Sequence, residues 1–364
     1  MTRVGPIGAL LAVVSFSACS EAPSGGGDEA IGSAIASVEP SDITFEVALR
    51  GTGSATIHAT VYSNARAGSG TNILAVHGFT TTGFEFGSLA AAIFQDPFLG
   101  RAVRRVIAIH LPGHGDSGFP ANLPDGVRFG DLNIDDNVSI VLQAIDALKD
   151  QGLAPRALIG HSVGGLDVQA AQEVLLARHS SLAAHGILSA VLLAPIPPHG
   201  QPWHTSPPRG EAPPPVNDPV LGSYFLTTPE VQIPGFFGTL AGQTIPAAPT
   251  PAQVVAARYI GPEPLAALLQ LVEAPMPLPT GGTTTVLRPT VRAGAFDLRR
   301  GTLLTLVSFS QDTNVHAGDL GSLYEYLTGD RRDRFYRPVV APDAVHAMLI
   351  SNPTDLLEAI RSRL

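Results

Sequence analysis

A serine flanked by glycines, where an apolar run passes into a helical pattern, carries the strongest chemical signal in this sequence. Residues 160–164 read Gly-His-Ser-Val-Gly, which between a strand and a helix indicates a nucleophile elbow, a tight turn that exposes the serine hydroxyl. We expect backbones to crowd at Gly160 and Gly164, where a side chain would not fit. A glycine-rich turn without chemistry is the alternative in a chain with 38 glycines. Ser162 is the predicted nucleophile, and the N–H of Val163 is a predicted oxyanion donor.

Such a serine needs a base, and His346 is the candidate. Of the eleven histidines, it alone combines a late position with a strand pattern before it and an apolar patch after it, which runs into Asn352-Pro353. Its Nε2 would reach Ser162 while its Nδ1 faces an acid. His199 and His204 could pair on a metal, but without a nearby third ligand a solvated or substrate-facing loop is favoured, and no metal is predicted.

The acid that orients this base is predicted to be Asp312. It follows the apolar and β-branched run Leu303–Ser310, which predicts a late strand. Asp319 is the nearby alternative, but its position fits the first turn of a helix better. An acid after the preceding strand, Ala190–Pro195, is disfavoured because no Asp or Glu follows it until Glu211. The remaining alternative is that Asp312 is an ordinary turn carboxylate.

A second oxyanion donor is expected after an earlier strand. Asn72–Val76 has the pattern of a buried strand and is followed by His77-Gly78-Phe79. The N–H of Phe79 would be the second donor, and Gly78 would let the backbone pass close to the substrate. His77 is predicted to be a structural histidine that hydrogen-bonds the loop, in preference to a catalyst.

Residues 106–117 add a family resemblance. They read Val-Ile-Ala-Ile-His-Leu-Pro-Gly-His-Gly-Asp-Ser, and a strand followed by Leu-Pro-Gly-His-Gly-x-Ser resembles a recurrent loop of the α/β-hydrolase superfamily, of serine esterase and lipase type. The resemblance implies the chain order nucleophile, acid, base, which the three candidates follow. No nucleotide or redox-cofactor motif appears in the sequence, so no cofactor is expected. Members usually carry Asp where this chain has His110, so the hydrogen bonding beneath the site is expected to differ. His114 is expected to brace the loop.

The order of the patterns predicts an α/β-hydrolase fold, a mostly parallel sheet covered by helices on both faces, with the site at the carboxyl ends of the strands. A hairpin pattern spans residues 43–61 and leads into the parallel strands. Strands are then expected near 72–77, 104–110, 156–161, 188–194, 303–309 and 336–341, and helices near 84–95, 134–151, 163–178, 316–328 and 353–363.

One interval, rich in proline, breaks this rhythm. Residues 196–301 are predicted to form a cap or lid inserted between two parts of the hydrolase core, 41–195 and 302–364, because a structureless loop of this length would be unusual. Its aromatic residues could wall an apolar pocket or form the small core of the cap itself. Helices are expected near 228–242, 251–259 and 262–273, and the aromatics are Trp203, Tyr224, Phe225, Phe236 and Phe237.

The first 40 residues are expected to direct export. Residues 1–19 resemble a bacterial signal with a lipobox-like end, since a positive charge precedes an apolar stretch too short to span a bilayer, and the only cysteine, Cys19, closes it. Lipidation of Cys19 would place the protein in the bacterial cell envelope, with residues 20–40 as a flexible linker. The alternative is an ordinary secretory signal, cleaved near Ala18.

The whole chain of 364 residues, 45% hydrophobic and 15% charged, fits one large globular domain, and its net charge of −9 gives no basic surface for nucleic acid. The expected activity is hydrolysis of a carboxylic ester, from a small-molecule or lipid-like substrate, through an acyl-enzyme. Amide, lactone or C–C bond hydrolysis by the same residues is the alternative, followed by a non-catalytic surface-binding protein on this fold. A serine nucleophile argues against epoxide hydrolases and haloalkane dehalogenases, which use Asp.

Overall fold

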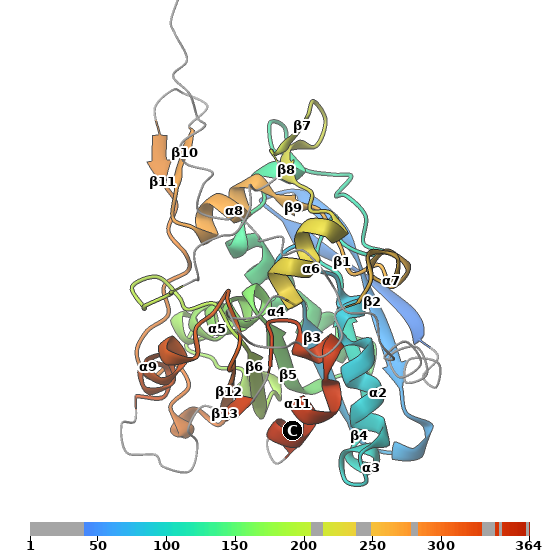
Figure 1. Cartoon of the computed structure of the whole chain (residues 1–364). Helices are drawn as coiled ribbons and strands as arrows, with labels where there is room; N and C mark the ends of the chain where they lie inside the picture. The colour runs from blue at the N-terminus through green and yellow to red at the C-terminus, as the bar shows by residue number, and fades with distance from the viewer. Residues whose placement is uncertain are drawn as a thin grey trace, which may run out of the picture.

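An eight-stranded sheet organises the chain, with the strand order β1-β2-β4-β3-β5-β6-β12-β13 (Figure 1). Neighbours from β4 to β13 pair in parallel, whereas β1 with β2 and β2 with β4 are antiparallel. This computed structural model describes residues 40–204, 214–237, 249–277, 283–329, 339–341, 344–361 and 364. The strands are β1 (Pro40–Leu49), β2 (Gly53–Ser63), β3 (Thr71–Val76), β4 (Val103–Ile109), β5 (Pro155–His161), β6 (Ser189–Leu193), β12 (Leu303–Phe309) and β13 (Val339–Ala341).

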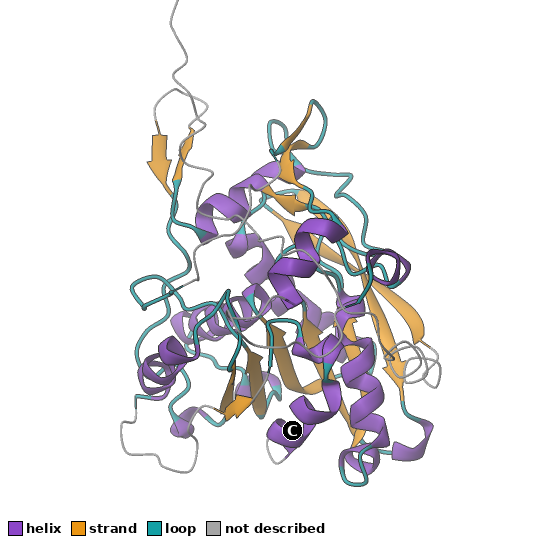
Figure 2. Cartoon of the chain, viewed as in Figure 1, coloured by secondary structure: helices purple, strands orange, loops and turns teal. Residues whose placement is uncertain are grey.

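Helices cover both faces of this sheet, as Figure 2 shows. Helices α2 and α11 pack against each other, and α4 packs against α5. The central strands are apolar over their carboxyl-terminal parts, where both of their faces are buried. The mostly parallel α/β-hydrolase architecture predicted from the sequence is confirmed. The helices are α2 (Gly87–Gln95), α3 (Leu99–Ala102), α4 (Ile134–Asp150), α5 (Val163–Ala177), α9 (Ala317–Thr328), α10 (Met348–Ser351) and α11 (Pro353–Ile360).

The leading hairpin is present at the predicted place. Along β1, Phe45, Val47 and Leu49 are buried and the residues between them are exposed, which is the alternation of a strand with one face on the core. Ile43 pairs with Ala59 in the register of the two strands. The hairpin therefore adds an antiparallel edge to the parallel set.

The segment between β6 and β12 contributes no described strand to the main sheet. Its helices are α6 (Pro229–Phe237), α7 (Pro251–Ala256) and α8 (Leu265–Leu271), all within or near the predicted positions. The sequence did not predict its strands, because pieces of two to four residues rich in proline have no periodic pattern. These strands form two small sheets: β7 (Val216–Asp218), β8 (Gly222–Phe225) and β9 (Glu263–Pro264) in one, and β10 (Pro275–Pro277) and β11 (Thr283–Thr285) in the other.

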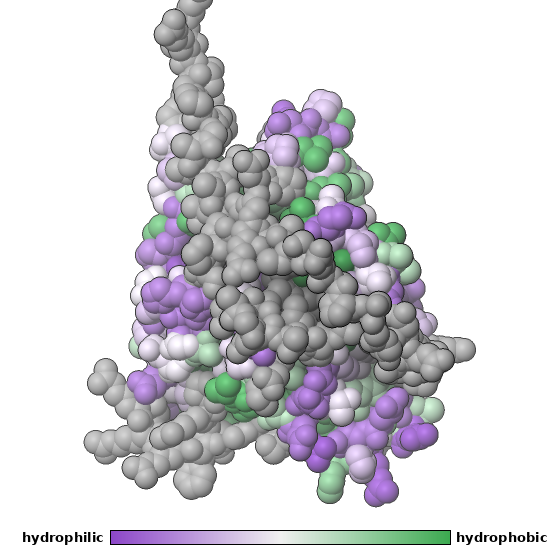
Figure 3. Space-filling view, viewed as in Figure 1, coloured by the Kyte–Doolittle hydropathy of each residue, from purple (hydrophilic) through white to green (hydrophobic). Residues whose placement is uncertain are grey.

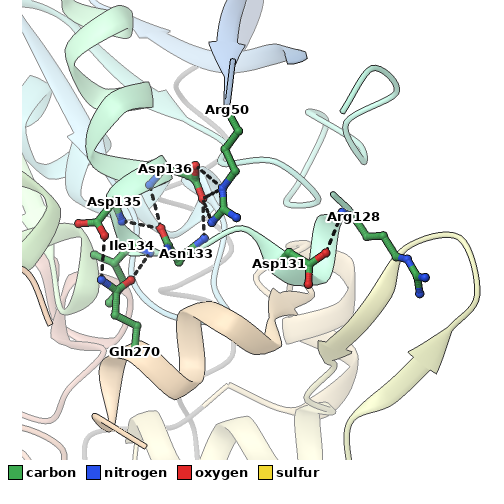
Figure 4. A network of polar contacts seen from close by, with 8 residues as sticks. All are labelled: Arg50, Arg128, Asp131, Asn133, Ile134, Asp135, Asp136 and Gln270. Atoms are coloured by element: carbon green, nitrogen blue, oxygen red, sulfur yellow. Dashed lines mark hydrogen bonds and ion pairs between the residues drawn. The ribbon is translucent and has the colours of Figure 1, made fainter. Parts of the chain in front are cut away.

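The inserted segment is joined to the core at the start of α4, which Figure 4 shows. Asn133 caps this helix, and the carboxylate of Asp136 accepts a hydrogen bond from the N–H of Asn133. Arg50, from the β1–β2 turn, binds Asp136 at 2.6 Å. Gln270, from α8, accepts a hydrogen bond from the N–H of Ile134 at 2.8 Å. Since helix starts lie at the carboxyl ends of parallel strands, α8 sits at that end of the core.

Several predictions for the N-terminus fall outside the described residues: the signal at 1–19, Cys19, and the linker at 20–40 except for its last residue. They stay predictions. Within the part of the chain that is described, no helix is long and apolar enough to cross a membrane. On the face drawn in Figure 3, hydrophobic side chains of the described residues lie in small groups among hydrophilic ones.

Candidate active site

Ser162 stands at the sharp turn between β5 and α5, as predicted. Its backbone has φ 53° and ψ −117°, a conformation that a residue with a Cβ adopts only when its surroundings enforce it. A Cβ atom at Gly160 would lie 2.5 Å from the carbonyl oxygen of Gly164, and one at Gly164 would lie 2.3 Å from that of Val76. The crowding expected at the two glycines is confirmed, and it explains why both positions exclude side chains.

Asp312 and His346 meet although 34 residues separate them in the chain. The Nδ1 atom of His346 lies 2.7 Å from Oδ2 of Asp312, and both side chains are buried, at 2% and 0% exposure. Asp312 follows β12 and His346 follows β13, two neighbouring parallel strands. The parallel pairing thus delivers an acid and a histidine to the same edge of the sheet, with the imidazole oriented by the carboxylate.

The acid loop is itself fixed on several sides. The second carboxylate oxygen of Asp312 accepts hydrogen bonds from the backbone N–H groups of Asn314, at 2.7 Å, and Val315, at 3.0 Å. The N–H of Gln311 donates to the carbonyl of Ala344, two residues before His346, at 2.9 Å. Because one oxygen of Asp312 is held by its own loop, the other is aimed at His346.

Phe79 and Val163, whose N–H groups are the predicted oxyanion donors, follow Gly78 and Ser162 in the chain. In the described part of the molecule, neither Phe79 nor Val163 has a hydrogen-bond partner for its N–H. Gly78 runs beside the serine, since a Cβ added there would lie 3.2 Å from Cβ of Ser162. The N–H of Gly78 is directed elsewhere and donates to Oε1 of Glu85 at 3.1 Å. Two donors are therefore available for a developing oxyanion.

His77 is a structural histidine, which confirms the prediction. Its Nε2 accepts a hydrogen bond from the N–H of Leu111 at 3.1 Å, and its Nδ1 lies 2.8 Å from the carbonyl oxygen of Gly78. Burial, together with the neighbouring His114, holds the pKa of His77 well below its usual value. The ring is neutral and ties the loop after β4 to the loop after β3.

His110 replaces the Asp that the family resemblance implies, and its contacts differ accordingly. Its Nδ1 accepts from the N–H of Gly83 at 3.2 Å, and its Nε2 lies 2.9 Å from the hydroxyl of Thr60. Burial lowers the pKa of His110 to about 3. The imidazole of His110 is therefore neutral, and its Nδ1 accepts one backbone N–H. His114 braces its own loop as expected, with Nδ1 3.0 Å from the carbonyl of Pro112.

Sequence reasoning missed Glu85 and gave no role to His161, yet the two form a fully buried pair. Nδ1 of His161 lies 3.1 Å from Oε1 of Glu85, and its Nε2 lies 2.9 Å from the carbonyl oxygen of His346. Both side chains are 0% exposed. The available signal was position alone: His161 lies inside the elbow motif, and Glu85 is the only acid in a stretch of apolar and small residues.

The alternative residues are engaged elsewhere. Asp319 lies in the first turn of α9, as expected, and its Oδ1 is 2.7 Å from Nδ1 of His204. His199 contacts a different carboxylate, with its Nδ1 2.9 Å from Oε1 of Glu273. Asp343, which lies close to His346 in sequence, falls outside the described residues. Among the described residues, Asp312 is thus the carboxylate that contacts His346.

The aromatic residues of the inserted segment fall into separate environments. The indole N–H of Trp203 donates to the carbonyl of Asn314, beside the acid loop, at 2.9 Å. Tyr224 packs 6.1 Å from Phe129 of the core, between ring centroids, and Phe225 is fully buried. Packing between segment and core therefore accounts for Tyr224 and Phe225. The side chains of Phe236 and Phe237 are not among those described.

The sheet, the elbow and the acid–histidine pair at the carboxyl ends of parallel strands define an α/β-hydrolase. The sequence model of the alpha/beta hydrolase family matches residues 73–359, which is most of the chain. The protein belongs to this family. Membership of this family supports hydrolase activity, and the predicted resemblance to the α/β-hydrolase superfamily is confirmed.

Similar proteins define the fold further. The dihydrolipoyllysine-residue acetyltransferase component of the acetoin cleaving system of Pseudomonas putida is 36% identical over 125 residues, which are 34% of this chain and only 29% of that protein. A variant of the N-acyl homoserine lactonase AidH, complexed with N-hexanoyl homoserine, has a TM-score of 0.52 and 16% identity, over 89% of this chain and 98% of that one. With N-butanoyl homoserine, AidH gives 0.51 and 15%, over 88% and 95%. At such identities, these structures share the fold alone.

Proposed function

We propose that the protein is a serine hydrolase that cleaves a carboxylic ester through an acyl-enzyme, with Ser162, His346 and Asp312 as its triad. The single observation that carries this proposal is the buried 2.7 Å contact between His346 and Asp312, on the side of the sheet where the elbow presents Ser162. A carboxylate on Nδ1 selects the tautomer whose Nε2 can accept a proton.

The reaction then runs in two halves. The hydroxyl oxygen of Ser162 attacks the ester carbonyl while His346 takes the hydroxyl proton, and the tetrahedral oxyanion is stabilised by the N–H groups of Phe79 and Val163. Collapse expels the alcohol, which receives that proton from His346. Water, deprotonated by the same imidazole, cleaves the acyl-enzyme and regenerates the serine. Asp312 holds the imidazole and stabilises its cationic form throughout.

We further propose that the segment 196–301 is a cap over this site. Besides its contacts at the start of α4, it is bound to the loop that follows β3. The N–H of Thr80, next to Phe79, donates to Oε2 of Glu263 at 3.0 Å, and the carbonyl of Thr80 accepts from the N–H of Gly261 at 3.0 Å. The hydroxyl of Thr82 donates to the carbonyl of Arg258 at 2.7 Å. A segment held so close to the oxyanion loop would determine which acyl groups fit.

A panel of p-nitrophenyl esters of graded acyl length, with a lactone and an amide alongside, tests the activity. We expect ester hydrolysis in the wild type, and a loss of turnover on the order of 10⁴-fold or more in Ser162→Ala and in His346→Ala, because nucleophile and base act as a unit. Circular dichroism checks that both variants keep their secondary structure. Near-normal rates in folded His346→Ala would show that the base is wrongly assigned, and equal rates in Ser162→Ala would refute the proposed nucleophile.

A further inference from the structure

Beneath Ser162, one buried pair touches the two loops on which the proposed reaction depends. We propose that Glu85 and His161 form a carboxylate–imidazolium pair that positions the loop of His346 and the loop of Phe79. This inference rests on the proposed function, because it assigns positioning residues to that reaction. Its basis is a continuous set of contacts from the N–H of Gly78 through Glu85 and His161 to the carbonyl of His346.

The proton count of the pair follows from its partners. A carbonyl oxygen can only accept, so the Nε2 of His161 that faces the carbonyl of His346 must carry a proton. The Nδ1 atom faces Oε1 of Glu85 at 3.1 Å, and an ionised carboxylate also only accepts. A singly protonated ring would set the Nδ1 lone pair against a carboxylate in a fully buried site. In the proposed pair both nitrogens of His161 are protonated, and Glu85 balances the charge.

The surroundings favour the ionised pair. Burial by itself lowers the pKa of His161, but the charge and hydrogen bond of Glu85, the carbonyl of His346 and the charge of Asp312 together raise it above the usual value. His77 also faces His161 and is neutral. The second oxygen of Glu85 has no hydrogen-bond partner among the described residues, so its interaction with His161 and Gly78 carries the stabilisation of this carboxylate.

The contacts indicate what the pair does. By binding the N–H of Gly78, Glu85 fixes the peptide that precedes Phe79, and this orientation leaves the N–H of Phe79 as the free donor. By binding the carbonyl of His346, His161 fixes the backbone from which the proposed base extends, with the two rings 4.9 Å apart. One pair thus sets the relative position of base and oxyanion donor, which matters most in the transition state.

Two measurements on the full-length protein test this role. In the first, ¹H–¹⁵N NMR of the imidazoles in the wild type at pH 7, with signals assigned by their loss in His161→Asn, is expected to show both ring nitrogens of His161 protonated. In the second, Glu85→Gln keeps the size of the side chain but removes the charge. We expect kcat to fall on the order of 10²-fold with KM nearly unchanged, since misplacement of reacting groups acts on the transition state. Glu46→Gln, an exposed acid on β1, is the matched control and keeps wild-type kinetics.

A single protonated nitrogen on His161 overturns the proposal, as does a wild-type kcat in Glu85→Gln, or a rise in KM with kcat unchanged. If Glu85→Gln does not fold, Glu85→Asp replaces it, and its kcat is expected to fall by less than the loss predicted for Glu85→Gln. The NMR measurement needs no variant of Glu85. Failure of the proposed function is seen separately: wild-type turnover that Ser162→Ala does not abolish refutes the serine hydrolase, whereas Ser162-dependent turnover that ignores Glu85 refutes only this pair.

Discussion

Buried polar groups have different numbers of hydrogen-bond partners in two regions: the region beneath Ser162, and the seam between the core and the inserted segment. Beneath the serine, both ring nitrogens of each of three buried histidines have a partner: His77, His110 and His161. At the seam, several buried atoms have no hydrogen-bond partner among the described residues: the hydroxyls of Thr80 and Thr227, Nε2 of His114, and both carboxylate oxygens of Asp167.

This difference has an energetic meaning. The three histidines beneath the serine are held rigidly, because moving any of their rings breaks a hydrogen bond inside the protein. A seam with unsatisfied groups has less to lose when it shifts. Nε2 of His114 illustrates this, since it lies 3.4 Å from Oε2 of Glu263 without forming a hydrogen bond. Changes beneath the serine should therefore act on turnover, and changes at the seam on substrate selection.

The largest effect is expected from the acid. Asp312→Asn should lower kcat on the order of 10³ to 10⁴-fold, because an amide in place of the carboxylate favours the wrong tautomer of His346. Asp319→Asn is the matched control: Asp319 is also buried but contacts His204, and its loss should change kcat less than threefold. Steady-state kinetics on the best ester of the panel measures both. A greater loss at Asp319 would reassign the acid.

The elbow, Asp312 and His346 could be predicted from the sequence because each follows a local pattern. The elbow is a five-residue motif with a strand before it and a helix after it, and Asp312 and His346 each follow a recognisable strand. The pair of Glu85 and His161 escaped because no local pattern marks an acid that is buried through contacts with residues 76 positions away. The small sheets of the inserted segment escaped for a related reason, since β9 has only two residues and pairs with β8 far away in the chain.

A smaller effect is expected at the seam. Glu263→Ala removes the acceptor for the N–H of Thr80. Because a hydrogen bond to a charged group contributes ~1.5–3 kcal/mol, we expect kcat/KM to fall by about tenfold, with a changed ranking of acyl lengths. Glu263→Gln retains an acceptor oxygen and should stay close to the wild type.

Arg258→Ala is the control for the seam, since it removes a half-exposed ion pair with Asp116 and such pairs contribute little. The measurement is kcat/KM across the ester panel for each variant. An unchanged ranking of acyl lengths in Glu263→Ala would mean that the hydrogen bond to Thr80 has no part in substrate selection.

The smallest effect on activity, and a distinct one on stability, is expected at Asp167 in α5. Burial and the nearby Glu263 raise the pKa of Asp167 well above its usual value, so the folded state keeps a proton that the unfolded chain releases. The stability that this proton gives is complete below the unfolded pKa of 3.8 and declines as the pH rises toward the folded pKa, at about 1.4 kcal/mol per pH unit. Asp167→Asn is neutral at every pH and lacks this decline.

Its melting temperature relative to the wild type should therefore be higher at pH 8 than at pH 5, while kcat stays within a few-fold. The raised pKa of His161 produces a decline of the same sign, but it is present in both proteins and cancels in the comparison. Asp150→Asn, at an exposed position of α4, should show no such dependence. Differential scanning calorimetry at the two pH values measures this difference. An equal difference in melting temperature at pH 5 and pH 8 would mean that Asp167 is ionised in the folded protein.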